Sequence, residues 1–102
     1  MPASSTRATL EARWFRLTRE ELPAVADARG WPVRLDHCFQ RILLDHAHGG
    51  CWYDHVPRRP AYRHCADDAL ARAVTLGEAA LAGDADLSAL NRRSLAWRGR
   101  AL

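Results

Sequence analysis

The apolar residues of this chain recur at the spacing of an α-helix, and the periodic segments end at glycine. Within residues 36–48, four of them share one side of a helix that turns about 100° per residue: Phe39, Ile42, Leu43 and Ala47. Gly49 and Gly50 follow directly, and glycine adopts the left-handed conformation that ends helices without steric cost. The sequence therefore predicts an amphipathic α-helix over residues 36–48, with Asp36 as its N-cap.

Three further segments carry helix start and stop signals, and we expect helices over residues 19–29, 67–82 and 86–98. Thr18 and Glu21 have the spacing of a capping box, in which two side chains satisfy backbone amides of the first helical turn. The second segment starts with two aspartates and stops at Gly83, and Asp84 or Asp86 precedes the third. An all-α fold, a bundle of about four helices, is the expectation.

The chain has 102 residues, which is enough for one domain, and 48% of them are apolar, which is enough for one core. Residues 1–9 are small and polar and predict a flexible arm. Residues 10–102 then form a single helical domain. Trp14 and Phe15 lie in a segment that forms either a short strand or the lead into a helix. Residues 51–64 contain two prolines and predict a long, ordered central loop.

All fifteen basic residues other than histidine are arginine, and the formal net charge is +3. This charge favours anionic partners only weakly. No apolar run approaches the length of about 20 residues that spans a bilayer, and no signal-peptide core is seen, so we expect no membrane association and no export. The three cysteines are an odd number at wide spacing, which indicates free thiols and a cytoplasmic location.

The start of the 36–48 helix brings reactive side chains together. His37, Cys38, Arg41 and Asp45 fall within one arc of the helix surface, away from the apolar side. A thiol in the first turn of a helix, beside positive charge, has the features of a reactive cysteine. The same arc suits a phosphate or carboxylate ligand. The simplest alternative is a cysteine that packs as a small apolar residue. The candidate catalytic residues are His37, Cys38 and Asp45.

Histidine and cysteine are plentiful, but their spacing matches no common zinc motif. The most compact set is His46, His48 and Cys51 around the Gly49-Gly50 turn. Histidines at the end of a helix more often interact with its exposed carbonyl groups. No metal and no cofactor is predicted.

The central loop mixes arginines with aromatic residues, a composition typical of single-strand nucleic-acid binding, in which guanidinium groups meet phosphates and rings stack on bases. The candidate nucleic-acid or anion-binding residues are Arg41, Trp52, Tyr53, Arg58, Arg59, Tyr62 and Arg63. The alternative is a solvated face whose arginines pair with nearby aspartates.

The leading hypothesis is a small basic protein that contacts nucleic acid through this loop and the adjacent His/Arg/Asp helix face. One alternative is a small enzyme or enzyme subunit whose pocket is lined by His37, Cys38, Arg41, Asp45 and Trp52. Another is a protein-partner module that exposes a patch of Trp14, Phe15 and Trp97.

Overall fold

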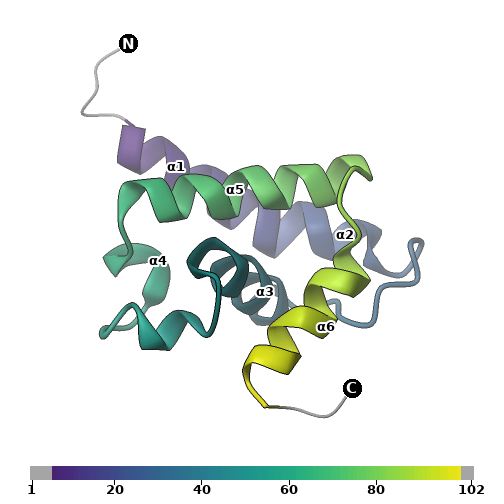
Figure 1. Ribbon diagram of the computed structural model, residues 1–102. Helices are drawn as coiled ribbons and strands as arrows, with labels where there is room; N and C mark the ends of the chain where they lie inside the picture. Colours follow the sequence, from purple (N-terminus) through teal and green to yellow (C-terminus); the bar gives the residue numbers. More distant parts are fainter. Residues whose placement is uncertain (1–5, 100–102) are drawn as a thin grey trace.

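The structure, a computed structural model, describes residues 6–99, and these residues form helices and loops with no β-strand. The predicted all-α fold is confirmed. The elements in chain order are α1 (Thr6–Arg16), the π-helical segment η2 (Leu17–Glu21), α2 (Leu22–Ala26), α3 (Asp36–His48), the 3-10 turn η3 (Trp52–Asp54), α4 (Ala61–His64), α5 (Asp67–Ala82) and α6 (Leu87–Trp97) (Figure 1).

The first three elements follow each other without a break and form one helical rod over residues 6–26. Residues 6–9, expected in the flexible arm, are helical, and residues 1–5 lie outside the described part of the chain. The π-helical segment ends with the amide of Leu22 donating to the carbonyl of Leu17, five residues earlier. Pro23 follows at once. Since proline lacks an N–H and crowds the carbonyl four residues before it, the wider π turn accommodates it within the rod.

The predicted capping box at Thr18 and Glu21 is wrong. Thr18 is fully buried in the middle of the rod, and its hydroxyl donates to the carbonyl of Trp14 at 2.9 Å. The side chain of Glu21 instead forms an ion pair with Arg13. The helix begins at residue 6 instead of residue 19, because packing of Trp14, Leu17 and Leu22 in the core outweighs the local capping signal.

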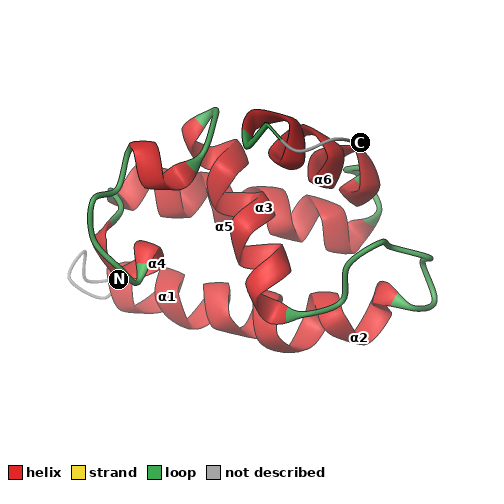
Figure 2. Cartoon of the chain, turned by 90° about the horizontal axis from the view of Figure 1, so that it is seen from below, coloured by secondary structure: helices red, strands yellow, loops and turns green. Residues whose placement is uncertain are grey.

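The helices form two layers. The α1–α2 rod and α5 lie side by side, and α3 crosses beneath them, as Figures 1 and 2 show. α6 packs beside α3 on the side away from α4. The core lies where α1, α3 and α5 meet, and its fully buried members include Trp14, Phe39 and Leu70.

Most predicted helix ends agree with the structure. Gly49 and Gly83 both have positive φ and end α3 and α5, as expected. The side chain of Asp86 accepts a hydrogen bond from the amide of Ala89 and caps α6. At the start of α3 the N-cap is Leu35, one residue before the predicted Asp36, which occupies the first helical position instead.

The central loop, which the sequence predicted to be long and ordered, contains two short helical turns, η3 and α4. Arg7 of α1 holds this region in place. Its guanidinium donates to the carbonyls of Tyr62 and Cys65 at 2.6 and 2.9 Å and also contacts Asp67. The loop is therefore fixed against the rod at the point where Tyr62 enters the site described below.

Gly77 lies in the middle of α5, on the side that faces α3 and the rod. A Cβ atom added there would lie 3.1 Å from Cδ1 of Leu43 and 3.3 Å from Cδ1 of Leu17. Both distances are shorter than ordinary contacts, which explains why glycine occupies a helix interior despite its cost of about 1 kcal/mol relative to alanine. The absent side chain lets α5 approach α3 and the rod.

We predict that Gly77→Val lowers the free energy of unfolding by about 1–3 kcal/mol, because the added methyl groups overpack this contact. Urea denaturation followed by circular dichroism measures the change. Thr75→Val, on the exposed side of the same helix, is the matched control and should leave stability nearly unchanged. Equal effects of the two substitutions would contradict the assigned close packing.

Candidate functional site

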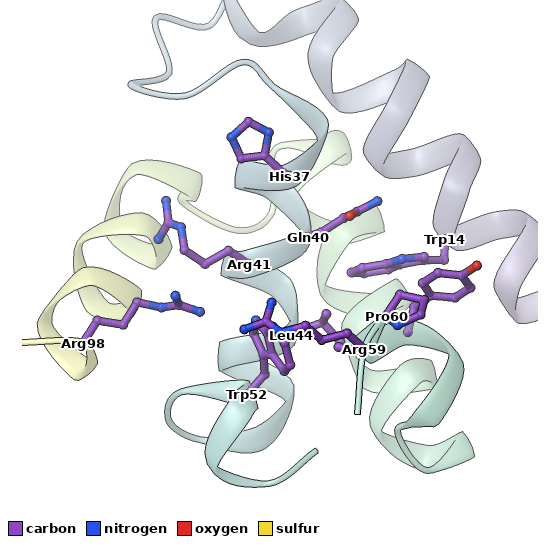
Figure 3. A pocket seen from close by; sticks show the side chains of 11 residues that line it. Trp14, His37, Gln40, Arg41, Leu44, Trp52, Arg59, Pro60 and Arg98 are labelled. Carbon is purple, nitrogen blue, oxygen red and sulfur yellow. The ribbon is translucent and has the colours of Figure 1, made fainter. Parts of the chain in front are cut away.

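A pocket of about 600 Å³ opens between the rod, α3, α6 and the central loop (Figure 3). Its polar wall consists of His37, Gln40, Arg41, Arg59 and Arg98. Its apolar and aromatic wall consists of Trp14, Leu44, Trp52, Pro60, Ala61 and Tyr62. The pocket is within the size range of small-molecule sites.

The spacing of residues on α3 explains its share of the wall. His37, Gln40, Arg41 and Leu44 are three or four residues apart, so one stripe of the helix faces the pocket. Cys38 and Asp45 belong to the neighbouring stripe and do not line the pocket. The four residues expected on one arc of α3 therefore lie on two stripes. His37 and Arg41 face the pocket, and Cys38 and Asp45 do not.

Asp45 is fully buried and its carboxylate accepts hydrogen bonds from three parts of the chain. The amide of Trp52 donates to Oδ1 at 2.9 Å, and the hydroxyl of Ser94 donates to Oδ2 at 2.7 Å. Nε and Nη2 of Arg98 donate at 2.8 and 3.0 Å. A carboxylate so occupied cannot meet a ligand or accept a substrate proton. Asp45 joins α3, the start of η3 and the end of α6, and was expected on an accessible face.

Arg41 is held by neutral partners. Its guanidinium donates to Ser94 Oγ at 2.8 Å and to Asn91 Oδ1 at 2.7 Å. Within residues 6–99 no carboxylate forms an ion pair with it. Burial lowers the pKa of the guanidinium from its ordinary value, and the positive charge of Arg98 lowers it further, against the attraction of Cys38 and Asp45. The charged form of Arg41 would thus gain from an anion in the pocket.

Two further arginines complete the charged part of the wall. Arg98 forms the ion pair with Asp45, and this hydrogen bond is the main reason that its pKa lies above the ordinary value. Its guanidinium also lies 5.1 Å from the ring centre of Tyr53. Arg59 lies over the ring of Trp52 at 4.9 Å. Because Asp45 offsets the charge of Arg98, the positive charges of Arg41 and Arg59 remain in the pocket wall.

The structure separates the other loop residues named from the sequence. Tyr62 lines the pocket and packs edge-on against Phe15. Tyr53 is exposed beside Arg98 but outside the pocket wall. Arg58 and Arg63 are exposed and are not part of the wall either. Of the seven candidate binding residues, four therefore line the pocket and three lie on the open surface.

Each member of the compact histidine-cysteine set forms a hydrogen bond with a backbone carbonyl. Nδ1 of His48 contacts the carbonyl of Leu44, and Nε2 of His46 contacts that of Leu90. The thiol of Cys51 donates to the carbonyl of Trp97. Among the described residues no three histidine, cysteine or acidic side chains come together in a geometry that could hold a metal ion.

The expected apolar patch of Trp14, Phe15 and Trp97 is not present in the structure. Trp14 is fully buried in the core, because its helix starts before it and turns it towards α3. Trp97 packs edge-on against His46 of α3. None of the helices within residues 6–99 combines the length and hydropathy needed to cross a bilayer.

Sequence reasoning did not identify several residues of the site. Trp14, Gln40 and Leu44 line the pocket, and Asn91 and Ser94 orient Arg41. The spacing of Gln40 and Leu44 relative to His37 was a usable signal, since all lie on one stripe of α3.

Comparison of the chain with protein-family models, with curated proteins and with solved structures finds no match.

We predict that Asp45→Asn lowers the free energy of unfolding by about 3 kcal/mol, because it leaves the mostly buried Arg98 without its counter-charge. Urea denaturation measures the loss. Asp68→Asn is the matched control, since Asp68 pairs with Arg72 on the exposed surface of α5, and should have little effect. A stable Asp45→Asn protein would show that the pair does not join α3 to α6.

The three thiols should differ in reactivity. Cys38 is partly exposed, whereas Cys65 is buried, and burial raises the pKa of the Cys65 thiol and so decreases its thiolate fraction at neutral pH. Limited alkylation with iodoacetamide, followed by peptide mass spectrometry, should label Cys38 first and Cys65 last. The unfolded chain, in which all three thiols are accessible, is the control. Labelling of Cys65 as fast as Cys38 would contradict the packing described.

Proposed function

We propose that this protein binds single-stranded nucleic acid and that the pocket on α3 is its phosphate-binding site. The observation that carries the proposal is the state of Arg41. Its guanidinium is partly buried in the pocket wall, is oriented by two neutral side chains and has no carboxylate partner among the described residues. Arginine held in this way is suited to a phosphate, whose oxygens accept its paired N–H groups.

The other residues of the wall support the same class of ligand. Arg98 and Arg59 place two more guanidinium groups at the pocket, and phosphate contacts by arginine supply most of the affinity of sequence-independent binding. Trp52 and Tyr62 present aromatic rings to the same space, on which bases stack irrespective of sequence. Arg58 and Arg63, exposed on the adjoining loop, extend the positive surface along which a strand would continue.

The enzyme alternative has less support. Cys38 does not line the pocket, and both carboxylate oxygens of Asp45 are occupied by hydrogen bonds. Of the proposed catalytic residues, only His37 faces the ligand space. Nucleophilic or general-base chemistry requires such groups to reach the reacting atoms. Binding is therefore the function that the geometry favours.

Arg41→Gln should weaken binding of a short single strand by roughly tenfold, equivalent to about 1.4 kcal/mol. It should also reduce the slope of log affinity against log salt concentration by about 0.7, the value for one lost phosphate contact. Fluorescence anisotropy with labelled single- and double-stranded oligonucleotides, titrated at several salt concentrations, measures both quantities.

Arg16→Gln is the matched control. It removes the same charge from an exposed position on α1 that does not line the pocket, and it should change affinity much less than Arg41→Gln. Affinity that is independent of salt, or that falls equally in the two variants, would refute the assigned phosphate site.

A further inference from the structure

The two ends of the pocket differ in chemistry. Arg41 and Arg98 lie at the end formed by α3 and α6, and the indole of Trp14 reaches in from the rod at the opposite end (Figure 3). Leu44 and Trp52 lie between these ends and provide apolar surface. A ligand that fills the pocket must therefore carry an anionic group at one end and a flat body that extends towards Trp14.

Trp14 adds a specific requirement at the inner end. Its side chain is fully buried, and Nε1 is a buried polar atom without a hydrogen-bond partner within residues 6–99. The neighbouring polar groups are engaged with each other, because the amide of Gln40 donates to Oγ1 of Thr18 and the Thr18 hydroxyl donates to the Trp14 carbonyl. The indole N–H is a donor only, and a buried unsatisfied donor is unfavourable. Because Nε1 has no exposed surface in the unliganded protein, a ligand acceptor reaches it only when the side chains at the inner end of the pocket move apart, and the new hydrogen bond then relieves this cost.

The rest of the wall selects for acceptors as well. None of the lining residues is aspartate or glutamate, and the arginines and the indole of Trp52 supply N–H donors. A pocket of about 600 Å³ holds one small organic unit. The unit that fits is acceptor-rich, anionic at one end and flat at the other.

We propose that the pocket takes up one unpaired nucleotide, with its phosphate at Arg41 and Arg98 and an acceptor atom of its base at the indole N–H of Trp14. This inference rests on the proposed function and specifies how a strand is recognised at that site. Each base has ring nitrogen or carbonyl acceptors and a flat face. A base stacked and paired in a duplex cannot enter, so the site distinguishes single from double strands. A free nucleotide has the same chemistry as a nucleotide of a strand.

Three probes test the inference on the unaltered protein: a short thymidine strand, a strand of equal length and charge made of abasic units, and thymidine 5′-monophosphate. Anisotropy of the labelled strands and calorimetry of the mononucleotide give the affinities. The thymidine strand should bind at least roughly tenfold more tightly than the abasic strand, since only the former can reach Trp14. This comparison needs no variant and is unaffected if a substitution prevents folding.

Trp14→Phe removes the N–H and keeps an aromatic ring. It should weaken binding of the thymidine strand by roughly tenfold and leave the abasic strand unaffected, so that the loss depends on the base. The matched control is Trp31→Phe, because Trp31 lies outside the pocket and packs against Phe39. It should change neither affinity. Circular dichroism verifies that both variants are folded.

The outcomes separate this inference from the proposed function. Equal affinity for the thymidine and abasic strands, with both weakened by Arg41→Gln, would overturn base insertion and retain strand binding. Binding of the mononucleotide that depends on Trp14, without binding of either strand, would retain the nucleotide pocket and overturn strand binding. Failure of all three probes to bind would overturn both.

Discussion

The buried carboxylate of Asp45 is the interaction on which the arrangement of the site depends. It is the only acidic side chain among residues 6–99 that is fully removed from solvent, and its cost of desolvation is offset by the guanidinium of Arg98, the Ser94 hydroxyl and a backbone amide. These contacts fix the angle between α3 and α6 and the start of the central loop. Because Ser94 also accepts from Arg41, the same carboxylate determines where the pocket cation lies.

The two arginines beside Asp45, Arg98 and Arg41, therefore differ in their roles. Asp45 is the counter-charge of Arg98 and joins it to α3, whereas the hydrogen-bond partners of Arg41, Ser94 and Asn91, are neutral. The aromatic residues divide in a similar way. Tyr53 lies against Arg98 outside the pocket wall, while Trp52 and Tyr62 both contribute to that wall. The proposed phosphate site therefore relies chiefly on Arg41, whose charge has no counter-ion among the described residues.

The sequence predicts the helices well where the local signals are self-contained. Gly49 and Gly83 end their helices as expected because positive φ is a local property of glycine. The rod was predicted poorly, because the local pattern at Thr18 suggests a helix start, while core packing of Trp14 and Leu17 continues the helix through it. Tertiary burial overrides capping preference in such cases.

The site was predicted in part, for a similar reason. Periodicity placed His37 and Arg41 on one face of α3, and composition drew attention to Trp52, Arg59 and Tyr62, which the fold brings to the same pocket. A helical wheel cannot show that Asp45 on the polar arc becomes buried, because its partners on α6 lie about fifty residues further along the chain. Nor can it show that Trp14 closes the pocket from another helix.

Nuclear magnetic resonance of the arginine side chains tests the central claim most directly. In a titration of the labelled protein with thymidine 5′-monophosphate, the Nε–Hε signals of Arg41 and Arg98 should shift together and saturate, while the signal of exposed Arg16 stays in place. Shifts spread over the exposed arginines, with the Arg41 signal unchanged, would contradict the account of a preorganised cation in the α3 pocket.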